Sequence, residues 1–402
     1  MQRTNGWLLL IASICVPLPL QAAPSLADML AAADKRHPGV ELADAERKLA
    51  TALSNKAEQP FASQPSANIK YQTDAVGSEL GYREWEGGID MPLWLPGQAD
   101  SYRREAESTL ATSDAIAQAR KLKLAGQVRE RLWAAAIARG EAEQAQSAVS
   151  AAKQLLQDVQ QRVEAGELPR NDQLLAQKEL IGREESLQQA KVQARQADQM
   201  FQHYTGIELP EQPGSEPLTT PAELADSHPS LQLARLRADQ AQARRDRVSS
   251  ESRPSPNLWL GAKSAKAASG NDYESSVGIE LSMPFATGAH SAPAIAEAEN
   301  SLTQARTEYQ LAHHELQEAL QLAQLELEQT SATLAQTEKR QRLAEASLKL
   351  NRRAFELGET DLVRLIQAQA DALSARHDYQ IRQLQHSQAV ARLNQALGVI
   401  PQ

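Results

Sequence analysis

The chain repeats itself at an offset of 191 to 192 residues, and this repeat constrains the fold more than any other feature. Four landmarks keep the spacing: His37-Pro38 recurs as His228-Pro229, Met91-Pro92 as Met283-Pro284, Gly166-Glu167 as Gly358-Glu359, and Gly206 as Gly398. Between the halves lie Pro210, Pro213, Gly214, Pro217 and Pro221, which cannot continue a helix. We therefore predict an internally duplicated chain, with a first repeat at 23–206, a proline-rich linker at 207–221 and a second repeat at 222–402.

The first residues have the pattern of a secretory signal peptide. Arg3 is followed by an apolar run from Trp7 to Leu20 and by two small residues, Ala22 and Ala23. We predict a signal peptide at 1–22, cleaved after Ala22. Cys15, the only cysteine of the chain, lies inside it, so the mature protein is expected to have no disulfide and no thiol chemistry.

Each repeat is expected to open with a short helix, at about 25–57 in the first, with Ser25 as its cap. Two segments with a period of two follow, which indicates strands. The apolar sets are Ala67, Ile69, Tyr71 and Thr73, then Trp85, Gly87, Ile89, Met91 and Leu93, and in the second repeat Leu258, Leu260 and Ala262, then Val277, Ile279, Leu281, Met283 and Phe285. The alternate positions include Glu84, Glu86, Asp90 and Glu280. Each half thus offers a β-hairpin with one apolar face, suited to lipid, and one acidic face, suited to a water-filled lumen.

After each hairpin the chain avoids proline for long stretches. A helix at about 98–165 would be about 100 Å long, and aromatic residues, at 4%, are too few for a thick core. Coiled-coil seams run through Leu156, Val159 and Val163, and through Leu343, Ser347, Leu350, Ala354 and Leu357. Gly166 and Gly358 can end the first helix of each pair in a left-handed conformation. Pro169, Thr360 and Asp361 can begin the second.

Four strands cannot close a barrel, and unpaired strand edges in lipid cost several kcal/mol per backbone group. We therefore expect several copies of the chain to share one sheet. Three protomers would supply twelve strands and continue them into a long antiparallel α-helical barrel. The fold class is thus an α+β membrane protein.

At this point the sequence resembles the TolC family of outer-membrane efflux proteins over essentially the whole mature chain. The resemblance depends on the order and doubling of GGIDMPL at 87–93 with VGIELSMP at 277–284, and of EAGE at 164–167 with FELGETDL at 355–362. It implies a homotrimer with a twelve-stranded barrel in the cell outer membrane and a periplasmic helical tunnel. The hairpin tips, Gly166, Glu167, Gly358 and Glu359, would dock to a periplasmic adaptor (membrane fusion protein) and an inner-membrane efflux pump. The segments 355–362 and 93–97 look most like the CzcC-like members that serve heavy-metal efflux pumps of the resistance-nodulation-division class.

The resemblance also locates an entrance at the tips, which acidic rings narrow in the archetypal member. The corresponding positions here, six and nine residues after Gly358, are Arg364 and Gln367, so an aspartate ring is not expected. Asp172 is the sixth residue after Gly166 and could pair with Arg364 to hold the entrance closed. The alternative is that both lie on solvated helix faces, where an exposed ion pair contributes only about 0–1 kcal/mol.

Several other functions are disfavoured. The histidine pairs His313 with His314 and His377 with His386 lack ligand spacing on one helix face, so no metal site and no cofactor are expected. No nucleophile signature or phosphate loop suggests an enzyme, and a net charge of −9 gives no reason to expect nucleic acid as a partner. Two alternatives stay open: an outer-membrane channel for drug efflux or type I protein secretion, and a periplasmic coiled-coil adaptor or scaffold.

Overall fold

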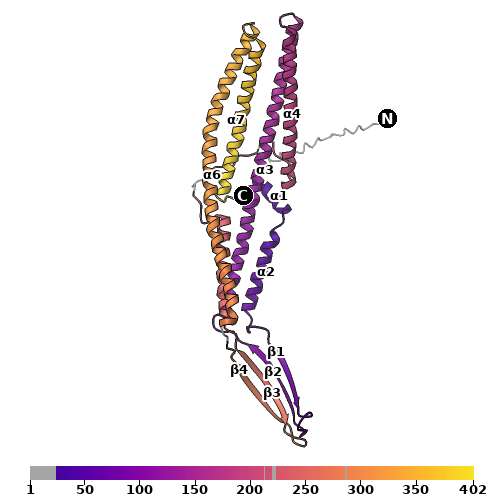
Figure 1. The fold of residues 1–402 in the computed structure, drawn as a ribbon, viewed down its shortest axis with the longest axis vertical. Helices are drawn as coiled ribbons and strands as arrows, with labels where there is room; N and C mark the ends of the chain where they lie inside the picture. The colour runs from indigo at the N-terminus through magenta and orange to yellow at the C-terminus, as the bar shows by residue number, and fades with distance from the viewer. Residues whose placement is uncertain (1–23, 212, 220–222, 286–287) are drawn as a thin grey trace, which may run out of the picture.

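The computed structural model describes residues 24–402 except 212, 220–222 and 286–287. The predicted signal peptide therefore lies outside the described residues. The protein is a long rod with a small sheet at one end and two helical hairpin tips at the other, and the C-terminus lies between them (Figure 1). Within the described ranges, no helix is both long and apolar enough to cross a membrane.

The helix expected at 25–57 is two helices, α1 (Leu26–Arg36) and α2 (Val40–Ala57). Ser25 caps α1 as predicted, in a capping box with Asp28. The break falls at His37-Pro38-Gly39 because a residue before proline disfavours the helical conformation and Gly39 takes a φ of +128°. The prediction of one continuous helix was wrong. The described part of the second repeat has only one opening helix, α5 (Pro229–Glu251), because four prolines occupy the preceding segment.

Four longer helices form the two hairpins. They are α3 (Gln98–Glu164) with α4 (Arg170–Thr205), and α6 (Gly288–Glu356) with α7 (Leu362–Ala396). The predicted helix at 98–165 is thus confirmed to within one residue. In the half near the sheet, α3 lies between α2 and α5, and α5 contacts α6. In the half near the tips, α3 lies between α4 and α7, and α7 contacts α6.

Two pairs of shorter helices therefore meet end to end. In the first pair α2 meets α4 alongside α3, and in the second α5 meets α7 alongside α6. At the first junction the His37 ring packs on the Tyr204 ring at 4.0 Å between centroids, and His37 Nε2 lies 3.2 Å from the carbonyl oxygen of Tyr204. At the second, Gly398 follows the end of α7, and a Cβ added to it would meet the His228 ring. Gly206 and Gly398 both take the left-handed conformation, with φ of +77° and +79°.

The strands form one antiparallel sheet in the order β1-β2-β3-β4. The strands are β1 (Ser66–Thr73), β2 (Arg83–Pro92), β3 (Asn257–Lys266) and β4 (Glu274–Ser282). Pairing between β2 and β3 joins the two predicted hairpins, with Gly88 opposite Gly261. Leu93, Met283 and Phe285, expected on strands, lie just beyond the strand ends.

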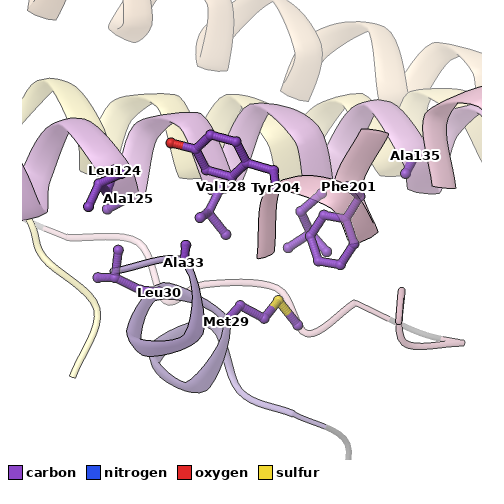
Figure 2. Close-up of a cluster of buried hydrophobic side chains, with 10 residues drawn as sticks. Met29, Leu30, Ala33, Leu124, Ala125, Val128, Ala135, Phe201 and Tyr204 are labelled. Atoms are coloured by element: carbon purple, nitrogen blue, oxygen red, sulfur yellow. The ribbon is translucent and has the colours of Figure 1, made fainter. Parts of the chain in front are cut away.

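The buried core is thin and divided into clusters. The largest lies at mid-length, where α1 crosses α3 and the end of α4 (Figure 2). Met29 and Ala33 of α1 pack there with Val128 of α3 and with Phe201 and Tyr204 of α4. A second cluster lies at the hairpin tips. This division agrees with the low aromatic content.

Polar side chains fix the proline-rich segment to the helices at mid-length. Arg129 is 2% exposed and donates to both carboxylate oxygens of Glu216 at 2.8 and 2.7 Å, and to Gln395 and the Val399 carbonyl. Asn394 donates to Glu216 and to the Pro217 carbonyl. This segment is thus anchored rather than free.

Candidate functional site

The four acidic residues predicted to share one face of the sheet do so. Glu84, Glu86 and Asp90 alternate along β2, and Asp90 lies opposite Trp259, which lies opposite Glu280 on β4. Because side chains in register across a sheet point to the same side, these carboxylates line one polar face.

The polar face is less acidic than expected, because lysines neutralise part of it. Lys263 Nζ lies 2.6 Å from Glu84, and Tyr82 also donates to that carboxylate, so Glu84 is buried rather than free. Lys70 Nζ lies 3.8 Å from Glu86. Asp90 accepts hydrogen bonds from two asparagines, Asn68 and Asn257.

The opposite face of the sheet is apolar and open. Its side chains are exposed without any covering element in the protomer: Ile69 (81%), Tyr71, Trp85, Ile89, Leu260, Val277 (89%), Ile279 and Leu281. Exposed apolar surface on this scale marks a membrane or protein contact.

Both hairpin tips have the same backbone geometry. Gly166 and Gly358 take φ of +79° and +75°, as predicted. Glu167 N donates to the Arg162 carbonyl and Glu359 N to that of Ala354, which completes a Schellman motif at each helix end. Asp361 caps α7, where its carboxylate accepts from Arg364 N at 2.8 Å. The four tip residues singled out from the sequence, Gly166, Glu167, Gly358 and Glu359, are all exposed.

The two tips pack on each other inside one protomer. Leu155 and Val159 of α3 share a buried cluster with Phe355 of α6 and Leu362 of α7. Arg162 donates to the carbonyls of Phe355 and Glu356 at 3.1 and 3.3 Å, and its guanidinium lies 4.8 Å from the Phe355 ring.

The three predicted entrance residues are not brought together in the protomer. Arg364 and Gln367 are exposed on α7, Asp172 is half-buried on α4, and no ion pair joins Asp172 to Arg364 among the described residues. Their pairing therefore remains a prediction that depends on neighbouring protomers.

Exposed apolar side chains follow both outer edges of the row of helices. On α6 they are Leu311, Leu322, Leu325, Leu343 and Leu350, with Leu357 just beyond its end, and on α2 and α4 they are Leu42, Leu49, Leu174, Ile181, Val192 and Met200. The seam through Leu343 and Leu350 is thus left open in the protomer, whereas Val159 of the other seam is fully buried.

Sequence reasoning missed three functional candidates: Arg162, Lys263 and Trp259. Arg162 gives no local signal, because its acceptors lie on the other repeat. Lys263 and Trp259 did give a local signal, because each lies two residues from Gly261, at positions of β3 that alternate with the apolar ones. In the described part of the chain, no cluster of three or more His, Cys, Asp or Glu residues could hold a metal ion.

Comparison with known proteins gives one family and a consistent fold. The family model described as outer membrane efflux protein matches residues 220–399. A comparison with curated protein sequences finds no significant relative.

Several solved structures have the same fold. The outer membrane protein VceC of Vibrio cholerae is 16% identical with a TM-score of 0.72, over 93% of this chain and 96% of that one. The open state of the MtrE outer membrane channel of Neisseria gonorrhoeae is 17% identical with a TM-score of 0.68, over 94% and 89%. CusC, whose structures concern transmembrane channel formation, is 16% identical with a TM-score of 0.68, over 93% and 92%.

Proposed function

We propose that the chain, whose residues 220–399 match the family model described as outer membrane efflux protein, forms a homotrimeric, passive conduit for export across the periplasm and outer membrane. The family match and the shared fold support an outer-membrane channel protein rather than an enzyme. The trimer, its twelve-stranded barrel and the cargo are the proposed parts.

The observation that carries the proposal is a sheet with one bare apolar face, one polar face and two free edges. Ile69 and Val277 on the apolar face are more than 80% exposed. β1 and β4 each lack a partner on one side within the described sheet. In lipid those edges must be paired, so copies of the chain would complete the barrel and enclose the face of Glu84, Glu86, Asp90 and Glu280 as its lumen.

The helices support the same closure. The helices of one protomer lie side by side in a row that has α2 and α4 at one edge and α6 at the other. The strand order of the sheet, from β1 to β4, runs in the same direction. The two edges of the row carry the exposed apolar side chains described above. An interface between one edge and the other is head-to-tail and closes into a ring, for which we propose three protomers.

At the other end of the ring we propose the entrance and the docking surface. Asp172 would pair with Arg364 of a neighbouring protomer near Gln367 and narrow the opening. The exposed tips at Gly166-Glu167 and Gly358-Glu359 would contact a periplasmic adaptor, and an inner-membrane pump would supply the energy. We also infer that the two halves arose by duplication, with 23–206 and 222–402 as the repeats and 207–221 as the linker.

A cross-link between the two edges tests the ring. Leu174 lies eight residues after Gly166 and Leu350 eight residues before Gly358, so both stand at the same height below the tips. Cys15 is the only cysteine and lies in the predicted signal peptide, so Leu174→Cys with Leu350→Cys gives a clean pair. Oxidation or a short bis-maleimide should produce a covalent trimer on a denaturing gel.

The matched control pairs Leu174→Cys with Leu322→Cys, which lies 28 residues closer to the sheet and about 42 Å away along the helix. It should not cross-link. Covalent dimers or trimers from the control, or only monomers from the test pair, would contradict the proposed ring. A scaffold that never enters the membrane would stay soluble without detergent.

For the cargo, the resemblance to the CzcC-like subgroup favours heavy-metal cations delivered by a resistance-nodulation-division pump. Drug efflux and type I protein secretion are the rival cargoes. A deletion strain should lose tolerance to heavy-metal salts and should regain it from a plasmid copy. Unchanged metal tolerance together with drug sensitivity would assign the channel to drug efflux.

A further inference from the structure

Trp259 is a large aromatic side chain on the polar face of the sheet. It stands in register between Asp90 of β2 and Glu280 of β4. Its neighbours along the strand, Leu258 and Leu260, belong to the apolar face. An indole is an unusual occupant of a face otherwise built from lysines, carboxylates and amides.

A row of three glycines lies under the indole ring. Gly88, Gly261 and Gly278 are paired across β2, β3 and β4. A Cβ added to Gly88 or Gly261 would overlap the ring, and one added to Gly278 would lie 3.1 Å from Trp259 Cζ3. Trp259 Nε1 reaches across β2 to donate to Asn68 Oδ1 at 3.2 Å. The ring thus lies flat on the backbone and presents its other face outward.

A pocket of about 370 Å³ opens over this outward face. It is lined by Asn68, Lys70, Glu86, Asp90, Asn257, Trp259, Glu280 and Ser282. Lys70 is drawn toward Glu86, and Asp90 is held by its two asparagines. Glu280 is exposed and no ion pair or hydrogen bond of its carboxylate occurs among the described residues, so its charge is available to a ligand.

We propose that the Trp259 face, with Asp90 and Glu280 on either side, is a binding subsite for organic ammonium cations. An aromatic face attracts a diffuse, weakly hydrated cation, and flanking carboxylates add charge complementarity. A small metal ion does not fit this arrangement. The backbones of β2 and β4, which carry Asp90 and Glu280, lie about 10 Å apart with Trp259 between them, and Asp90 is held by two asparagines, so the described residues offer no group of three or more metal ligands here.

The inference rests on the proposed function, because it takes the polar face to be the lumen of an export channel. Three copies of the subsite would then line the barrel at one level. A hydrophobic cation leaving the helical tunnel would meet these sites just before release. The inference concerns a ligand site in the barrel, and it leaves both the proposed heavy-metal cargo and the entrance at the hairpin tips unaffected.

Choline and 3,3-dimethyl-1-butanol provide a direct test, because they share a shape and differ by one positive charge. Saturation-transfer NMR on the purified, detergent-solubilised protein should show contact with choline methyl groups and little with the neutral alcohol. Trp259→Leu and Glu280→Gln should each raise the Kd of choline about two- to fivefold. Glu274→Gln, on the same face but six residues away along β4, should leave it unchanged.

If Trp259→Leu fails to fold, Glu280→Gln carries the test, and Trp259→Phe, which keeps an aromatic face on the glycines, should retain most of the choline binding. Equal binding of choline and the alcohol, or a choline Kd that neither Trp259→Leu nor Glu280→Gln raises, would overturn the subsite. Measuring whether choline blocks the current in planar bilayers tests the subsite separately from the channel proposal. A protein that conducts but ignores choline refutes the subsite alone, whereas choline contact without any conductance refutes the channel alone.

Discussion

Replacing Arg129 by methionine should loosen the proline-rich segment at mid-length. Arg129 is buried and makes four hydrogen bonds, two of them to the Glu216 carboxylate. Methionine fills much of the same space but leaves Glu216 with Asn394 Nδ2, at 3.2 Å, as its remaining side-chain partner. The negative charge is then buried without its cation.

The structure sets the size of the effect. Removing one partner of a buried ion pair costs about 3–5 kcal/mol. The Glu216 side chain is 13% exposed, which allows some hydration, so the lower end applies. About 3 kcal/mol corresponds to roughly a hundredfold larger population of the opened segment.

Native-state proteolysis measures that population. A glutamate-specific protease can cut after Glu211 and Glu223 in the opened segment, and intact-mass spectrometry follows the two half-chain products. The cleavage rate should rise roughly a hundredfold while opening remains fast relative to cleavage. The double variant Arg129→Met with Glu216→Met should be nearly as resistant as the parent, because apolar pairs can replace buried ion pairs.

Arg340→Met is the matched control, since Arg340 pairs with Asp378 on the surface with 60% of its side chain exposed. It should change cleavage little. A cleavage rate for Arg129→Met within about twofold of the parent, instead of about a hundredfold above it, would refute the role of Arg129 in anchoring the proline-rich segment. So would a double variant as labile as the single one.

Three other outcomes follow from the structure. Burial lowers the pKa of His228, so the contribution of its neutral form to stability is present above the unfolded pKa of about 6.5 and is lost as the pH falls below it. Protection factors at the start of α5, which correct hydrogen exchange for the pH dependence of the intrinsic rate, should therefore fall between about pH 7.5 and 5.5. They should fall less in His228→Asn, while the exposed His314→Asn should behave like the parent. Gly358→Ala should destabilise the tip by about 1–2 kcal/mol because of its positive φ, whereas Gly182→Ala in the middle of α4 should stabilise by about 0.5–1 kcal/mol, as measured by local hydrogen exchange. If the proposed pairing of Asp172 with Arg364 closes the entrance, Arg364→Ser should raise single-channel conductance, and an unchanged conductance would remove that gate.

Much of the architecture could be predicted because its signals are local. The alternation at Trp85, Ile89 and Met91 fixes a strand and its two faces, and the long absence of proline after Pro96 fixes a helix. The left-handed glycines at Gly166 and Gly358 are also local, since they need only the end of a helix.

The missed features depend on contacts between distant segments. Glu84 looked free in sequence, and only the pairing of β2 with β3 places Lys263 beside it. The prediction of one helix at 25–57 missed the break at Pro38, although the proline marks it. The open seam at Leu343 shows the same limit, since its partner is not in the protomer.

The end-to-end helix junctions have a mechanical consequence. Of the helices described, α3 and α6 alone run unbroken from the sheet to the tips, while the other two lines are interrupted at mid-length. We therefore expect a torque on the tips to be taken up partly by movement at the two helix junctions. In each protomer only α3 and α6 would transmit the remainder toward the sheet. If the sheet lies in lipid as proposed, where its backbone hydrogen bonds are costly to break, these junctions would limit how much movement at the tips reaches the strands.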